Sequence, residues 1–177
     1  MHKKYLIALA LSTITSPVFA QNSVQFTGKI YDEGCTIKVN NAVDTIVNLG
    51  NYNKDRIPNK GDTTDYVPFS VSLTDCPAVS TISPQALIRF TGETEGSESF
   101  FKNEADAASA AKNVGVILKN DKNAIVIENE DNEPVDLPEE GGDLSLTYYA
   151  AMVNNGVGES VSGGDVSSVV TFNVSYQ

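Results

Sequence analysis

The chain ends in the eleven residues Ser167-Ser168-Val169-Val170-Thr171-Phe172-Asn173-Val174-Ser175-Tyr176-Gln177. From Val170 to Tyr176, apolar residues occupy every second position and polar residues lie between them. A period of two is typical of a β-strand with one buried face. Chain ends fray unless another element holds them, so the pattern predicts a terminal strand that needs a partner strand.

Further short segments of this kind precede the terminal strand and predict an all-β chain. They cover residues 24–30, 35–39, 45–49, 66–73, 86–91, 114–118, 124–127 and 144–153, and turn-forming residues separate them. Many short strands at this spacing favour a β-sandwich. The alanine-rich residues 102–112 are the one helical candidate, expected as a short helix or as a loop over the sandwich.

The first twenty residues predict export. A basic start at Lys3 and Lys4 precedes an uncharged apolar stretch over residues 5–14, and Ala20 ends a suitable cleavage site. This order is typical of a secretory signal peptide. A membrane anchor is the weaker alternative, because the apolar run is too short to cross a bilayer core of about 30 Å. We expect a mature chain of residues 21–177 that forms one domain.

The charge balance argues against a nucleic-acid partner. The 177 residues include 12 basic and 23 acidic ones, for a net charge of −11. Without Lys3 and Lys4, ten basic residues stand against 23 acidic ones, for a net charge of −13. A surface of that sign repels nucleic acids and anionic membranes.

Cys35 and Cys76 are the only cysteines, and both follow the expected cleavage site. A single pair in an exported domain favours a disulfide. The bridge would close a loop of about 40 residues and stabilise the fold by roughly 3–4 kcal/mol. A metal site is the weaker alternative, since two thiols without a nearby histidine do not complete a zinc shell.

Residues suited to catalysis are scarce. His2, the only histidine, belongs to the expected signal peptide, so the mature chain lacks the commonest general base. Ser160 lacks the second glycine of a nucleophile elbow. We therefore expect neither enzymatic activity nor a cofactor.

An acidic stretch at residues 128–143 is the other candidate for chemistry. It could supply a calcium site or a pair of catalytic carboxylates. However, it lacks the ligand spacing of a calcium loop, and Pro134 and Pro138 interrupt it. A solvated loop is the better interpretation, because runs of like charge usually stay in water.

The expected strand at residues 24–30 stands at the start of the mature chain. Val24, Phe26, Gly28 and Ile30 share one of its faces. The strand could be the first of the sandwich, or a detachable arm that pairs with another molecule. Gly28 favours the arm, since glycine inside a strand often marks the close approach of another chain.

Five features in order resemble the pilin subunits of the chaperone–usher pathway, especially type 1-like fimbrial subunits. They are Phe26-Thr27-Gly28-Lys29-Ile30, the pair Cys35 and Cys76, Val67-Pro68-Phe69-Ser70-Val71-Ser72-Leu73-Thr74-Asp75-Cys76, Asn113-Val114-Gly115-Val116, and Gly164 with the penultimate Tyr176. The resemblance covers the whole mature chain.

The resemblance implies an immunoglobulin-like β-sandwich that lacks its last strand. Residues 1–20 would be a signal peptide, 21–34 an N-terminal donor-strand extension, and 35–177 the pilin domain. The implied donor residues are Val24, Phe26, Gly28 and Ile30, and the implied acceptor groove, which also binds the chaperone, includes Gly164, Val170, Phe172, Val174 and Tyr176. In this family a chaperone fills the groove first, and a neighbour's extension then replaces it.

The implied function is that of a structural subunit of a cell-surface fimbria, which contributes to cell adhesion. The implied partners are a periplasmic pilus chaperone, an outer-membrane usher and neighbouring pilin subunits, met during export through the periplasm. The short extension leaves open whether this is a main rod subunit or a minor tip subunit. A secreted, single-domain, lectin-like adhesin that binds a host glycan is the alternative function.

Overall fold

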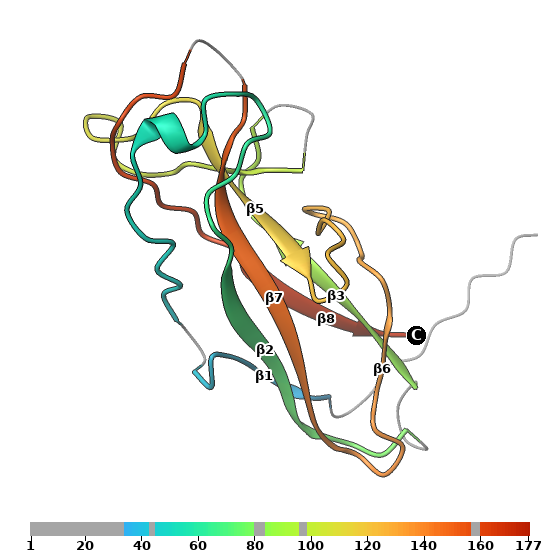
Figure 1. The fold of residues 1–177 in the computed structure, drawn as a ribbon. Coiled ribbons are helices and arrows are strands. Elements are labelled where there is room, and N and C mark those ends of the chain that lie inside the picture. The colour runs from blue at the N-terminus through green and yellow to red at the C-terminus, as the bar shows by residue number, and fades with distance from the viewer. Residues whose placement is uncertain (1–33, 43–44, 80–83, 96–98, 157–159) are drawn as a thin grey trace, which may run out of the picture. The chain divides into compact units, whose positions relative to one another are not determined.

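The computed structural model describes residues 34–42, 45–79, 84–95, 99–156 and 160–177, and shows two antiparallel sheets (Figure 1). The first sheet contains, in order, β1 (Thr36–Val39), β2 (Val67–Cys76), β7 (Gly142–Asn154), β5 (Val114–Asn120) and β4 (Phe101–Lys102). The second contains β6 (Val135–Asp136), β3 (Gln85–Thr91) and β8 (Thr171–Tyr176). The expected all-β fold is confirmed. The expected signal peptide and donor strand lie outside the described residues.

The principal core lies between the two sheets. Its buried members come from both sheets and their connections: Val39, Phe69, Val71, Ile88, Phe90, Phe101, Val116, Leu118, Val126, Tyr148 and Ala150. Alternate residues of each strand point inward, as in Phe69 and Val71 of β2. Phe90 lies at the centre, fully buried, with its ring edge-on to those of Tyr148 at 4.8 Å and Phe172 at 4.9 Å.

The register of the long strands follows from this alternation. β2 pairs with β7 from Val67↔Ala150 to Leu73↔Leu144. β5 pairs with the other edge of β7, from Val114↔Asn154 to Asn120↔Tyr148. A slip of one residue would turn every apolar side chain of a strand away from the core, so the buried face fixes the pairing.

One expectation was wrong in detail. Residues 45–49 keep their alternation, with Val47 and Leu49 packed against the core, but they form no strand. Of the two alternatives expected for residues 102–112, a short helix or a loop, the structure shows a loop over residues 103–112. In that loop the side chain of Asp106 accepts a hydrogen bond from the backbone N–H of Ala108, and such local bonds compete with helix formation.

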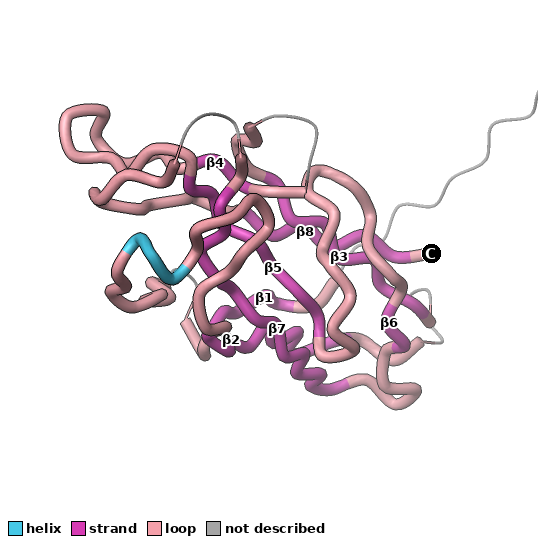
Figure 2. Tube along the Cα trace, turned by 45° about the horizontal axis from the view of Figure 1, so that its top comes forward, coloured by secondary structure: helices cyan, strands magenta, loops and turns pink. Residues whose placement is uncertain are grey.

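The chain has elements that the sequence did not predict. The 3-10 helix η1 (Lys54–Arg56), cyan in Figure 2, lies among loops away from the C-terminal end of β8. Strands β4 and β6 contain two residues each, too few to show any periodicity. Residues 124–127, expected as a strand, form no strand; they meet the edge of β5 through the isolated bridge Lys119↔Ile125 and the hydrogen bonds beside it.

Tyr148 should make the protein lose stability as the pH rises into the alkaline range. Burial, with a smaller effect from the charge of Asp121, raises the pKa of Tyr148 to about 12. The neutral phenol therefore stabilises the fold fully below pH 10, and this contribution is lost as the pH rises from about 10 to about 12. The loss should reach about 2–3 kcal/mol, at 1.36 kcal/mol for each pKa unit.

We expect Tyr148→Phe to reduce the loss of free energy of unfolding between pH 10 and pH 12. Urea unfolding of the full chain at a series of pH values measures it. Tyr52→Phe, at a more exposed tyrosine, is the matched control and should keep the wild-type slope. A Tyr148→Phe variant with the wild-type slope would show that other groups cause the alkaline loss.

Candidate functional site: the open side of the sandwich

Among the described residues, β8 has a strand neighbour on one edge only. It pairs with β3 from Ala86↔Tyr176 to Thr91↔Thr171, and the N–H of Gln177 donates to the carbonyl of Gln85 at 3.0 Å. In an antiparallel ladder, the backbone groups of successive residues point to opposite edges. The N–H and C=O groups of Phe172 and Val174 therefore point away from β3, toward the other edge.

The same strand presents a row of apolar side chains to the core. Phe172, Val174 and Tyr176 are half-buried, as is Val170 just before the strand. The alternate residues Thr171, Asn173 and Ser175 are exposed. The alternation expected from the sequence is confirmed, and the role of these residues as acceptors stays a prediction.

The opposite side of the sandwich is covered by the chain itself. Val126 is buried, and its N–H donates to the carbonyl of Leu118 at the edge of β5. The next residues run along β3, where the N–H of Asn129 donates to the carbonyl of Phe90 at 2.8 Å. β6 then pairs with the start of β3. Both sheet edges on that side have a neighbouring segment.

In the part of the chain that the structure describes, no such segment covers the side between β1 and β8. We call this region the open side. Its half-buried apolar residues are Ile37, Val47, Leu49, Val170, Phe172, Val174 and Tyr176. Ile46 and Val169 are 91% and 69% exposed, and both adjoin this row in the sequence. The open side thus combines a strand edge with incompletely buried apolar side chains.

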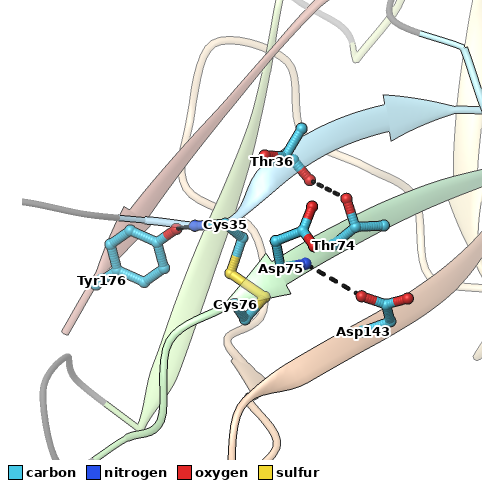
Figure 3. The surroundings of a disulfide bond; sticks show 7 residues. All are labelled: Cys35, Thr36, Thr74, Asp75, Cys76, Asp143 and Tyr176. Carbon is cyan, nitrogen blue, oxygen red and sulfur yellow. Dashed lines mark hydrogen bonds between the residues drawn. A yellow bond between two sulfur atoms is a disulfide. The ribbon is translucent and has the colours of Figure 1, made fainter.

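One end of the open side is tied by two contacts (Figure 3). The disulfide Cys35–Cys76 joins the start of β1 to the end of β2, so the expected disulfide is confirmed. The hydroxyl of Tyr176 accepts a hydrogen bond from the N–H of Cys35 at 2.6 Å. A Cβ built on Gly34 would lie 2.9 Å from that hydroxyl. Gly34 therefore lies at the C-terminal end of β8.

Gly164, expected with the acceptor residues, lies outside β8 and precedes it in the chain. A Cβ at this position would overlap the backbone of Ser109, Ala110 and Ala111, so only glycine fits. A cavity of about 70 Å³ adjoins it, with Ile57 among its lining residues. The structure thus separates Gly164 from the row of side chains on β8.

The acidic stretch at residues 128–143 is split between turns, β6 and the start of β7. Arg89 pairs with Asp131 at 2.9 Å, and Lys122 pairs with Glu133 at 2.7 Å; both pairs are exposed. Such pairs contribute little to stability. Within the described ranges, no three acidic, histidine or cysteine side chains are grouped to hold a metal ion.

None of the helices that the structure describes has the length and apolar character needed to span a membrane.

Comparison with known proteins identifies the family. The family model described as fimbrial protein matches residues 24–177. The chain belongs to this fimbrial protein family.

Two relatives illustrate the similarity. The chain is 32% identical over 180 residues to the probable major fimbrial subunit LpfA of Escherichia coli O157:H7, which covers 99% of this chain and 97% of that protein. It is 27% identical over 175 residues to the type-1 fimbrial protein, C chain, of Escherichia coli, with coverage of 97% and 93%.

Solved structures share the fold. The P pilus rod subunit PapA superposes with a TM-score of 0.68 at 18% identity, over 82% of this chain and all of that chain. A chaperone–usher pilus structure gives a TM-score of 0.65 at 20% identity, over 92% and 100%. These structures confirm the expected fold class, an immunoglobulin-like sandwich that lacks its last strand.

Proposed function

We propose that this chain is a structural subunit of a bacterial surface fimbria, which assembles by donor-strand exchange and contributes to cell adhesion. The open side carries the proposal, since β8 has an edge without a described neighbour beside a row of half-buried apolar residues. Membership of the fimbrial protein family and the fimbrial relatives support it.

The physical chemistry of the open side calls for an added strand. An apolar strand edge is a site of aggregation unless something covers it. An incoming strand would supply backbone hydrogen bonds to β8 and apolar side chains to the core. Strand addition is a recognised binding mode, and chaperone–pilin complexes are a known example of it. Each apolar side chain buried in this way contributes about 1.5–3 kcal/mol before the cost of ordering the strand.

The proposed partners follow the order of export. The predicted signal peptide directs the chain to the periplasm, where a pilus chaperone covers the open side. At an outer-membrane usher, the extension of a neighbouring subunit replaces the chaperone. Donor residues Val24, Phe26, Gly28 and Ile30 then contact acceptor residues Val170, Phe172, Val174 and Tyr176, and Gly164 holds the chain before β8. Because each subunit donates at one end and accepts along β8, the contacts are head-to-tail and build an open filament.

Deletion of residues 21–30 tests the donor role. The shortened chain keeps the disulfide and the open side, so it should still bind a chaperone and accept a strand, but should donate none. We expect the amount of fibre sheared from cells to fall at least tenfold, as measured by immunoblotting.

Gln25→Ala is the matched control for this deletion, because its side chain lies on the opposite face of the expected strand from Phe26. It should leave the amount of fibre unchanged. Fibres of normal length and subunit content from the deletion variant would contradict the proposed function.

A further inference from the structure

We infer that Asn103 and Glu104 position the start of the acceptor strand β8, and that strand acceptance by the open side depends on their side chains. The inference rests on the proposed function, because it concerns the same open side. It adds two polar residues that lie outside β8 and outside the row of apolar acceptor side chains.

The pairing of β8 with β3 stops before the apolar row of the open side does. The last pair of this ladder is Thr91↔Thr171, whereas Val170, one residue earlier in the chain, already belongs to the open side. Gly92 does not extend the ladder, because its N–H and its carbonyl both bond to the side chain of Asn129, each at 3.2 Å. The chain that leads into β8 therefore needs another support.

Two residues that follow β4 supply this support. The N–H of Ser167 donates to Oδ1 of Asn103 at 3.0 Å, and the N–H of Val169 donates to Oε2 of Glu104 at 2.9 Å. The backbone N–H of Glu104 donates in turn to the carbonyl of Ser167 at 2.7 Å. We call the hydrogen bonds of Asn103 and Glu104 to residues 165–169 the clasp.

The two side chains of the clasp act in different ways. Asn103 is half-buried, and its Nδ2 also donates to the carbonyls of Asp165 and Ala111, both at 2.9 Å. One planar amide therefore holds backbone groups of two separate segments. Glu104 is exposed, but its bond to a backbone N–H has an ionised acceptor, and such bonds are stronger than neutral ones.

The clasp lies where the C-terminal segment passes from one sheet to the other. Residues 165–169 bond to the chain that continues β4 of the first sheet, and Thr171–Tyr176 pair with β3 of the second. Among the described strands, β8 has no neighbour on its other edge. Val170 is therefore placed by the clasp on one side and by the β3 ladder on the other.

An ordered edge accepts a strand more readily than a frayed one. Where the start of β8 is frayed, an incoming strand has to order it, and the lost conformational entropy opposes binding. The clasp orders this part of the chain in advance. Neither Asn103 nor Glu104 belongs to the buried core, so loss of their side chains should reduce strand acceptance much more than it reduces global stability.

A full-length chain with Asn103→Ala and Glu104→Ala tests the inference. We expect the amount of sheared fibre to fall at least tenfold, as measured by immunoblotting, while the midpoint of urea unfolding stays close to the wild-type value. Hydrogen exchange of single amides, measured by NMR, locates the effect. The amides of Ser167 and Val169 should exchange at least tenfold faster, and that of Gln177, bonded to Gln85 at the other end of β8, less than twofold faster.

Two further variants show whether the acceptor oxygen at residue 104 matters. Glu104→Gln keeps an acceptor oxygen, so it should form much more fibre than Glu104→Ala. Glu140→Ala, which removes an exposed glutamate just before β7, is the matched control and should leave the amount of fibre unchanged.

The contrary outcomes each overturn the inference or a defined part of it. Normal fibre formation by the double variant would overturn it entirely. A large fall in the urea midpoint of both the double variant and Glu104→Ala would assign the clasp to global stability instead. Equal losses of fibre from Glu104→Gln and Glu104→Ala would overturn the part assigned to Glu104. Failure of the proposed function is distinct, because it is seen as normal fibres from the deletion of residues 21–30.

Discussion

A chain with Gly28→Phe is expected to assemble into fibres roughly 5- to 150-fold less efficiently than the wild type. In the proposed donor-strand contact, Gly28 lies on the face that meets the acceptor residues, and a ring there would compete with Phe172, which already lies beside Phe90 and Phe69. Overpacking of this kind costs about 1–3 kcal/mol, which corresponds to a loss of roughly 5- to 150-fold in affinity. The rate at which the full-length variant displaces a bound chaperone, and the amount of fibre formed, measure the effect.

A second substitution that restores assembly is the most specific control for Gly28→Phe. Adding Phe172→Ala to the Gly28→Phe chain exchanges the large and small members of the pair, and assembly should recover several-fold relative to Gly28→Phe alone. Two residues in contact show such coupling, whereas distant residues have additive effects. Thr27→Phe adds the same volume to the opposite face of the strand and should assemble normally. If Gly28→Phe and Phe172→Ala lowered assembly additively, the two residues would not be in contact.

The terminal strand shows how far sequence periodicity determines the fold. Alternation from Val170 to Tyr176 predicted which side chains turn toward the core, because a period of two has one buried face. The same pattern failed at residues 45–49, where the inward residues pack on the core without a described strand neighbour. Periodicity reports which face is buried, and it does not report whether an edge is paired.

The open side itself depends on contacts that local sequence cannot predict. The covering of the opposite side comes from residues 124–136, whose short apolar run gave no sign that it would extend along β3. The contact of Tyr176 with Cys35 joins residues 141 positions apart. The polar residue Asn132 bonds through its side chain to the carbonyl of Ile88, and sequence alone places it in a solvated loop. Contacts between residues far apart in the sequence decide which side of the sandwich is covered and which is open. Only the structure or the family resemblance indicates them.

Removal of the disulfide is expected to lower the free energy of unfolding by roughly 3–4 kcal/mol, the chain-entropy value for a loop of about 40 residues. Strand β1 contains four residues and pairs only with β2 among the described strands, so few other interactions hold it. Its start is joined to β2 by Cys35–Cys76 and to β8 by the hydrogen bond from Cys35 to Tyr176. Loss of the bridge should therefore loosen one border of the open side.

Urea unfolding of the full-length Cys35→Ala, Cys76→Ala chain measures this loss, and the wild-type chain unfolded under reducing conditions should show the same midpoint. Thr74→Ala, which removes only a weak side-chain bond at 3.5 Å to the carbonyl of Thr36, is the matched control and should change stability by less than about 0.5 kcal/mol. Because a loosened β1 no longer borders a fixed acceptor, the cysteine-free chain should also form little fibre. A loss below about 1 kcal/mol with normal fibre formation would mean that pairing with β2 alone positions β1, and that the bridge is not needed to define the open side.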